Sequence, residues 1–132
     1  MDIKIYNFEP HGDERGQLVA IQENIDIPFD IKRVYYMYKT IPNMVRGKHA
    51  HKKLEQILIC TSGSCKIHLD DGKETAEVTL DKPWEGLYLS HNMWREMYDF
   101  TDDAVLMVLA SELYDTEDYI RDYDEFVRSV EG

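Results

Sequence analysis

The feature that most constrains the fold of this chain is a period-two alternation of apolar and polar residues that recurs through its first 110 positions. The alternating segments are short, rich in β-branched and aromatic residues, and separated by turn sequences such as Asp71-Gly72. They predict strands at residues 4–8, 17–22, 31–38, 54–60, 65–69, 75–80, 86–89, 94–100 and 104–110. Short strands at such close spacing are typical of an all-β sandwich, jelly roll or barrel.

The hydrophobic period changes near the C-terminus. From Leu113 to Val130, apolar residues recur every three or four positions, which is typical of one buried stripe on a helix. A length of 132 residues fits one domain. We therefore expect a single domain over residues 1–132, with a β body at about 3–110 and an amphipathic helix at about 116–130.

The distribution of charge narrows the classes of partner. The formal net charge is −11, and residues 99–132 hold eleven acidic side chains against only Arg121 and Arg128. This acidic tail argues against a nucleic-acid-binding face. Basic residues gather earlier in the chain, at Lys32, Arg33, Arg46, Lys48, Lys52, Lys53 and Arg95. A pocket for one small anionic ligand needs only two or three converging cations, so such a pocket is the function class that this pattern favours.

The sequence also indicates where the protein works. Its longest apolar run, residues 104–110, is far shorter than the roughly 20 residues needed to cross a bilayer. The N-terminal residues lack the apolar core of a signal peptide. Cys60 and Cys65 are the only cysteines, and a chain with this much core needs no disulfide. We expect a cytoplasmic protein with reduced thiols and no membrane partner.

The densest group of reactive side chains lies in residues 46–55. On an extended strand His49 and His51 point to the same face, where two imidazoles can bind a metal or transfer protons. Two unconnected surface histidines are the alternative interpretation. In the preceding strand, Arg33 and Tyr35 share one face, so both can point inward.

This segment resembles a known motif. His49, His51 and Glu55, in the pattern His-x-His-x3-Glu followed by a turn glycine at Gly63, are similar to the first signature motif of the cupin superfamily, small jelly-roll barrels that bind ligands inside the barrel. In metal-binding cupins a second motif adds a third histidine, and here Arg95 stands at that position. Because an arginine repels a cation, the resemblance implies a cupin jelly roll without a metal. Glu55 is then expected to orient a histidine or the ligand.

A closer resemblance covers residues 3–125. The segments that carry it lie at 27–36, 46–56, 86–88, 94–97, 108–115 and 118–121. They resemble the sugar 3,4-ketoisomerases, which act on dTDP-4-keto-6-deoxy-D-glucose. The resemblance implies that a ketone moves from C4 to C3 of the sugar through an enediol, by acid/base proton transfer, with neither a metal nor a redox cofactor.

The resemblance also implies roles for individual residues. His49 is expected to be the main acid/base group at carbon, with His51 and Tyr35 relaying protons between the sugar oxygens. Arg33 and Arg46 are the candidates for the diphosphate, because a guanidinium can grip phosphate oxygens with paired hydrogen bonds.

Several questions stay open. Arg15 and Arg95 are expected near the sugar, where members of the family set the configuration of the product, but an arginine at both positions matches neither usual pairing. Members of the family form homodimers and often exchange N-terminal strands, so a homodimer is expected here. Three alternatives remain: a dTDP-sugar 3,5-epimerase, a non-catalytic nucleotide-sugar-binding module, and a metal-dependent oxygenase.

Overall fold

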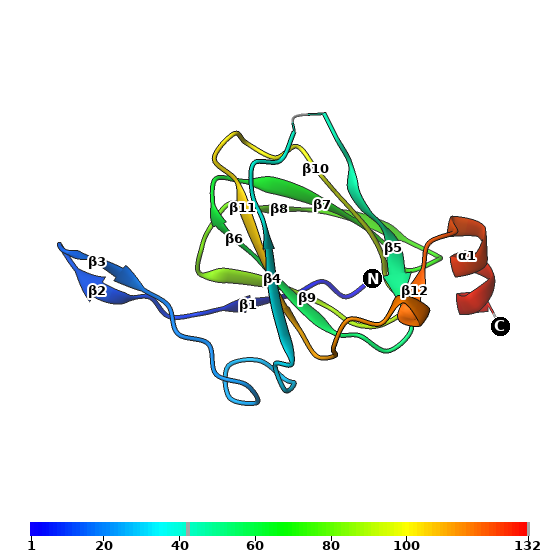
Figure 1. Cartoon of the computed structure of the whole chain (residues 1–132), viewed down its shortest axis with the longest axis horizontal. Helices are drawn as coiled ribbons and strands as arrows, with labels where there is room; N and C mark the ends of the chain where they lie inside the picture. The colour runs from blue at the N-terminus through cyan, green and yellow to red at the C-terminus, as the bar shows by residue number, and fades with distance from the viewer. Residues whose placement is uncertain (42, 132) are drawn as a thin grey trace.

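The computed structural model describes residues 1–41 and 43–131, and two antiparallel five-stranded sheets face each other in it (Figure 1). The first sheet has the order β1 (Lys4–Asn7), β9 (Glu85–Leu89), β6 (Gln56–Ser62), β11 (Val105–Ala110) and β4 (Arg33–Met37). The second has the order β12 (Tyr119–Ile120), β5 (Arg46–His51), β10 (Trp94–Tyr98), β7 (Cys65–Asp70) and β8 (Thr75–Leu80). One short helix, α1 (Tyr123–Glu131), follows. This architecture confirms the expected all-β cupin jelly roll with a C-terminal helix.

The alternation of side chains along the strands builds two separate cores. In β6, Leu58 and Cys60 point between the sheets, whereas Ile57 and Ile59 point to the outer face of the first sheet. The outer residues are covered by the segment that contains Ile27 and Phe29. Because both faces of β6 are buried, this strand is almost continuously apolar in sequence.

Helix α1 packs on the outer face of the second sheet. Phe126 is fully buried there against Ala50, Trp94 and Ile120. The helix begins at Tyr123, so the predicted start near residue 116 was wrong. Residues 116–118 form a 3₁₀ turn, and the next two residues pair with β5 as β12, because the open edge of that strand offers hydrogen bonds that a helix there would leave unused.

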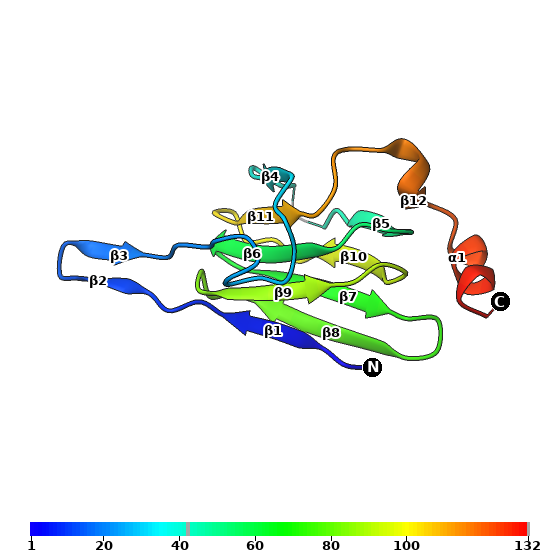
Figure 2. The ribbon, with the colours of Figure 1, turned by 90° about the horizontal axis from the view of Figure 1, so that it is seen from below.

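Two further elements differ from the sequence prediction. Strand β5 was not among the predicted strands, although His49 and His51 were expected on extended backbone. Its sequence is mostly polar and so lacks a clear alternation, and in the structure Gly47 and Lys48 both have positive φ and interrupt the strand. The strand predicted at 17–22 is reduced to β3 (Gly16–Leu18), which pairs with β2 (His11–Asp13). This hairpin projects beyond the barrel as an arm (Figures 1 and 2).

The structure shows the state of the two cysteines and the length of the helices. Cys60 and Cys65 are both buried as free thiols in the interior core. In the part of the chain that the structure describes, no helix has the length and hydropathy needed to cross a membrane.

Candidate active site

A β-bulge in β5 decides which residues enter the barrel. Arg95 lies opposite His49 and Met97 lies opposite Arg46, although the two β5 residues are three positions apart. In a regular strand, residues three apart point to opposite faces. Lys48 is the extra residue of the bulge and shifts the alternation by one position. Arg46 and His49 therefore lie on the same face and both point inward.

His49 presents a free base to the interior. Its Nδ1 lies 2.9 Å from the carbonyl oxygen of Gly47. A carbonyl only accepts, so Nδ1 carries the hydrogen and Nε2 keeps its lone pair. Burial, reinforced by the charge of Arg95, lowers the pKa of His49 to about 4. The imidazole is therefore neutral at pH 7 and can act as a general base.

His51 is held by a carboxylate. Its side chain is 1% exposed, and its Nδ1 lies 3.2 Å from Oδ2 of Asp118. Burial and the charge of Arg95 lower the pKa of His51, so neutral His51 donates its Nδ1 hydrogen to Asp118. The backbone N–H groups of Lys53 and Leu54 donate to the same carboxylate and fix its position. Within residues 1–41 and 43–131, the buried Nε2 of His51 has no hydrogen-bond partner, which leaves it available to a ligand.

Arg95 is fully buried in the interior. Its Nη1 donates to Oε1 of Gln56, and the Nε2 of Gln56 donates to the hydroxyl of Tyr35 at 2.8 Å. Its Nη2 is buried without a partner among the described residues. Burial lowers the pKa of Arg95 to about 10, so the guanidinium remains charged at pH 7. The interior thus contains a cation with a free donor.

Aromatic rings complete the walls. The Tyr119 ring lies 4.9 Å from that of His49 and 4.4 Å from that of His51, centroid to centroid. The guanidinium of Arg121 stacks on Tyr119 at 4.2 Å. Arg33 lies over the Tyr35 ring at 4.9 Å. Tyr119 and Asp118 were not among the predicted site residues, because both belong to a segment that was interpreted as helix.

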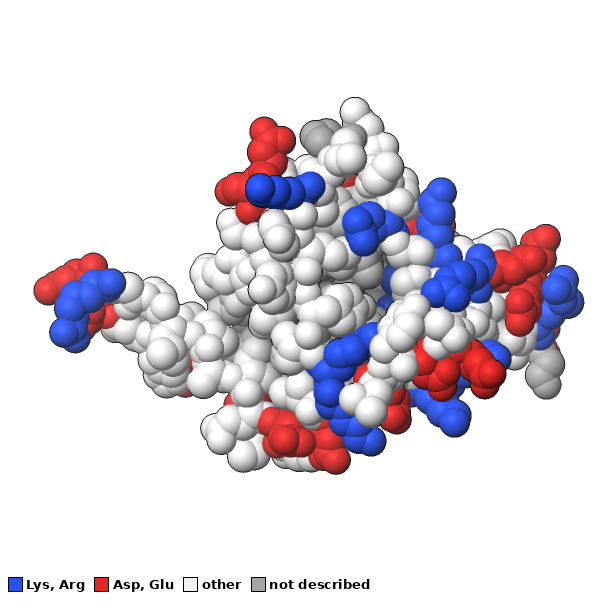
Figure 3. All heavy atoms as spheres, in the orientation of Figure 1, with Lys and Arg blue, Asp and Glu red and all other residues white. Residues whose placement is uncertain are grey.

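Most of the predicted site residues line two adjoining cavities. One, of about 370 Å³, includes His51, and the other, of about 240 Å³, includes Tyr35, Arg46 and His49. Their shared lining residues are Arg33, Tyr114 and Tyr119. Lys and Arg side chains lie on this face of the molecule together with Asp and Glu side chains (Figure 3). The larger cavity is lined by three basic residues, Lys32, Arg33 and Lys53, and by three acidic ones, Glu112, Asp115 and Asp118, whereas the charged residues that line the smaller cavity are Arg33 and Arg46.

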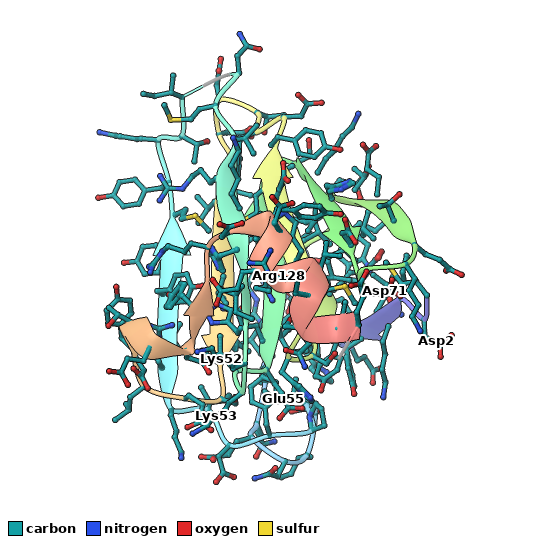
Figure 4. The ribbon with its side chains drawn as sticks, turned by 90° about the vertical axis from the view of Figure 1, so that its right-hand side faces the viewer. Asp2, Lys52, Lys53, Glu55, Asp71 and Arg128 are labelled. Carbon is teal, nitrogen blue, oxygen red and sulfur yellow. The ribbon has the colours of Figure 1, made fainter. Side chains whose placement is uncertain are left out.

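Three predicted site residues line neither cavity: Arg95, which is fully buried in the interior, Glu55 and Arg15. Glu55 accepts a hydrogen bond from the Tyr88 hydroxyl and lines neither cavity. Figure 4 shows it at the edge of the barrel, on the loop between β5 and β6 that also carries Lys53. Arg15 is 87% exposed in the β2–β3 arm, where it pairs with Asp13 at 2.6 Å.

The donor set does not fit the metal of metal-binding cupins. Among the described residues, no three His, Cys, Asp or Glu side chains are grouped so that they could hold an ion. His49 and His51 share the interior with the buried charge of Arg95, which would repel a cation.

Comparisons with known proteins show which family the chain resembles. A family model described as "FdtA: WxcM-like, C-terminal" matches residues 1–131. A TDP-4-oxo-6-deoxy-alpha-D-glucose-3,4-oxoisomerase from Aneurinibacillus thermoaerophilus is 55% identical over 98% of this chain and 94% of its own length. A 3,4-ketoisomerase structure from Helicobacter canadensis is 52% identical, with a TM-score of 0.96 over 100% of this chain and 99% of its own.

A third relative is known with a ligand. A mutant of the 3,4-ketoisomerase QdtA from Thermoanaerobacterium thermosaccharolyticum, in complex with TDP-4-keto-6-deoxyglucose, is 47% identical. Its TM-score is 0.96 over 98% of this chain and 94% of its own. The chain described here belongs to the FdtA/WxcM-like family, together with these sugar 3,4-ketoisomerases.

Proposed function

We propose that this chain is a sugar 3,4-ketoisomerase that converts dTDP-4-keto-6-deoxy-D-glucose into a dTDP-3-keto-6-deoxyhexose. One observation carries the proposal: two neutral histidines, whose Nε2 atoms accept no hydrogen bond from the described residues, and a tyrosine hydroxyl line adjoining cavities that also hold Arg33 and Arg46. Moving a ketone to the neighbouring carbon requires groups that give and take protons near neutrality, and these side chains supply them. The named activities of the relatives support the same reaction.

The carbon chemistry centres on His49. Its Nε2 removes the proton from C3, and the electron pair forms the C3–C4 double bond while the C4 carbonyl oxygen takes a proton. The resulting enediol loses the proton of its C3 hydroxyl, and protonated His49 returns a proton to C4. The ketone then stands at C3, and hydrogens have only been redistributed, so no net oxidant is consumed.

The oxygen protons pass through Tyr35 and His51. Tyr35 donates to the C4 oxygen, because its hydroxyl oxygen already accepts from Gln56 and its own hydrogen is free. His51 accepts from the C3 hydroxyl through Nε2, and Asp118 stabilises the imidazolium that forms. Proton transfer from His51 back to Tyr35 completes the cycle.

The remaining predicted residues act in binding. Arg33 and Arg46 line the cavities and are proposed to bind the diphosphate through paired hydrogen bonds. The Nη2 of Arg95 has no hydrogen-bond partner among the described residues, and we propose that it donates to a sugar oxygen. Glu55 is proposed to act indirectly, by fixing the loop after β5 through Tyr88.

The decisive experiment follows the sugar by NMR in deuterated water. Incubation with dTDP-4-keto-6-deoxy-D-glucose is expected to give a 3-keto product with deuterium at C4, and the H4 coupling pattern would identify the face that is protonated. Exchange at C3 and C5 with inversion and no carbonyl migration would point to the epimerase. Saturable binding without any exchange would leave the non-catalytic binding module.

The variant His49→Asn separates an enzyme from a binding module by a second route. In the ketoisomerase, loss of the base should abolish C3 exchange while the nucleotide still binds. In a binding module, the variant should keep its affinity and lose nothing else. Calorimetric titration of dTDP confirms that the variant still binds in both cases, and loss of the C3 exchange that the wild type shows by NMR is the result that identifies the enzyme.

We also propose a homodimer of single-domain chains. An apolar cavity of about 530 Å³ lies on the outer face of the first sheet, beside the arm. Trp84, which lines this cavity, is 39% exposed, and Leu18 on the arm is 60% exposed. Arg15 belongs to the same arm, which projects away from the barrel of its own chain (Figure 1). Arg15 could therefore contact a sugar only in the site of a second copy of the chain.

Mixing two variants with complementary defects tests this arrangement. Arg15→Ala chains keep His49, and His49→Asn chains keep Arg15, so mixed dimers should regain one working site if Arg15 acts across the interface. Light scattering should give twice the chain mass. Activity of the mixture that stays at the sum of its components would refute the shared site. We further propose a cytoplasmic location, supported by the two buried free thiols and by the nucleotide-linked substrate.

A further inference from the structure

Gln56 is a buried polar residue between two site residues. It is 0% exposed at the start of β6, and its neighbours in the strand alternate so that its side chain points between the sheets. Its amide oxygen accepts from Arg95, and its amide nitrogen donates to Tyr35 at 2.8 Å. Burying an amide is unfavourable unless both ends are satisfied, and here both are.

Arg95 fixes the direction of this hydrogen-bond chain. A guanidinium has five donors and no acceptor, so only the amide oxygen of Gln56 can face it. The amide nitrogen must then face Tyr35, and the phenol oxygen must accept. Tyr35 can therefore donate its own hydrogen only away from Gln56, into the cavity that it lines together with His49.

We infer that Gln56 is a positioning residue that makes Tyr35 a proton donor to the substrate, an inference that rests on the proposed ketoisomerase function. Before the transfer, Gln56 turns the phenolic hydrogen toward the ligand. After the transfer, its N–H remains hydrogen-bonded to the phenolate oxygen, and the charge of Arg95 lies behind it.

The electrostatic surroundings of Tyr35 are consistent with this role. Burial raises the pKa of the phenol, and Tyr119 adds to the rise. The charge of Arg95, the hydrogen bond from Gln56 and the charge of Arg33 all act in the opposite direction. The Arg95–Gln56 pair thus favours the phenolate form that proton donation creates.

A purely structural role would be served better by a glutamate. Glu at position 56 has the same shape, and its carboxylate would neutralise the buried guanidinium of Arg95. It could only accept, however, so it would take the hydrogen of Tyr35 and reverse the direction of the chain. The amide is the group that satisfies Arg95 and still leaves the Tyr35 hydrogen for the substrate.

Gln56→Glu therefore tests the direction of the hydrogen bonds without changing shape. We expect Tm to stay the same or rise, KM to change little, and kcat to fall by about 100-fold or more, as for loss of a general acid. Gln22→Glu, which adds the same charge at an exposed position, is the matched control and should keep wild-type kcat. A kcat for Gln56→Glu within threefold of wild type would overturn the inference.

A double-mutant cycle with Tyr35→Phe asks whether Gln56 acts through Tyr35. If it does, Gln56→Glu adds no further loss of kcat once the hydroxyl is gone. Losses that multiply would show an independent effect and overturn the inference. If Gln56→Glu does not fold, Gln56→Met, which removes both hydrogen bonds, enters the same cycle with the same expectation.

A measurement without substrate separates this inference from the proposed function. In protein labelled with ¹³C at tyrosine Cζ, the Tyr35 signal reports its titration, and Tyr35→Phe identifies that signal. Gln56→Glu should raise the Tyr35 pKa relative to wild type, because a carboxylate replaces a hydrogen-bond donor. An unchanged pKa would overturn the inference even if the wild type isomerises its substrate. If the wild type moves no carbonyl, the proposed function fails and this titration still decides the positioning.

Discussion

Replacement of Arg95 by Met should stabilise the unliganded protein while it damages the site. Arg95 is fully buried, its hydrogen bonds go to the neutral oxygens of Gln56 and Met93, and none of the described residues forms an ion pair with it. Burial lowers its pKa from the ordinary value of an arginine to about 10. That fall corresponds to roughly 3 kcal/mol of unfavourable free energy for keeping the charge in the fold.

The net effect follows from two opposing contributions. Met has a similar length and no charge, so Arg95→Met removes the penalty of about 3 kcal/mol. It also leaves the amide oxygen of the buried Gln56 without a donor, which costs about 1–2 kcal/mol. The carbonyl of Met93, a half-buried residue, is assigned no cost, because water can replace the Arg95 donor there. We expect the free energy of unfolding at pH 7 to rise by about 1–2 kcal/mol, and Tm by about 4–8 °C. Urea unfolding and calorimetry measure the two quantities.

The same variant should shift the titration of His49. Arg95 and His49 are directly opposite across β10 and β5. At a separation of about 6 Å and an effective dielectric constant of about 20, one unit charge contributes roughly 3 kcal/mol, or up to about two pH units. The pKa of His49, now lowered to about 4, should therefore rise by about one to two pH units.

An NMR titration of the His49 ring, with His49→Asn to identify its signal, measures this rise. A fall in the free energy of unfolding of Arg95→Met by more than about 1 kcal/mol would refute the reasoning, because the buried cation would then be net stabilising. An unchanged His49 titration would refute the electrostatic part.

Three further predictions concern other parts of the molecule. Asp118→Asn should lower kcat by about 100-fold in the NMR assay, because His51 loses the carboxylate that fixes its tautomer and stabilises its protonated form; unchanged kcat would contradict this role. Gly63→Ala should lower the free energy of unfolding by at least about 2 kcal/mol, because Gly63 has φ +65° and a Cβ there would lie 2.2 Å from Oγ1 of Thr101. Urea unfolding measures this loss, and an unchanged midpoint would show that the turn adapts. Since the pKa of His49 is lowered to about 4, the imidazole stays neutral as the pH falls, and kcat/KM should decline only below about pH 5. A decline centred at about pH 6.5 would mean that His49 is not desolvated.

The local pattern of the sequence was sufficient for the all-β class, for most of the strands and for part of the site, whereas β5 and the order of the strands in the two sheets came only from the structure. Side chains in a strand alternate with period two, so His49 and His51 had to share a face, as did Arg33 and Tyr35. The structure places all four around the two adjoining cavities. The interior position of Arg95 also agrees with the second cupin motif in which it was found.

The helix boundary shows where local pattern fails. Apolar residues at three- and four-residue steps continue back to Leu113, but Tyr119 and Ile120 pair with β5 instead. A short apolar segment fits a strand or a helix equally well, and the unpaired edge of a distant strand decided between them.

The sequence by itself determined which ionisable side chains this protein has, its imidazoles, guanidinium groups and phenols, and the alternating strands that place several of them on one face. Only the tertiary structure decided which groups meet. The bulge that brings Arg46 inward is a matter of register between β5 and β10, and the contact between His51 and Asp118 joins residues 67 positions apart. Gln56 became part of the site because Arg95 and Tyr35, from two different strands, both reach its amide. Local periodicity specifies the face on which a side chain lies, whereas the partner on that face is set by strand pairing over long distances in the chain.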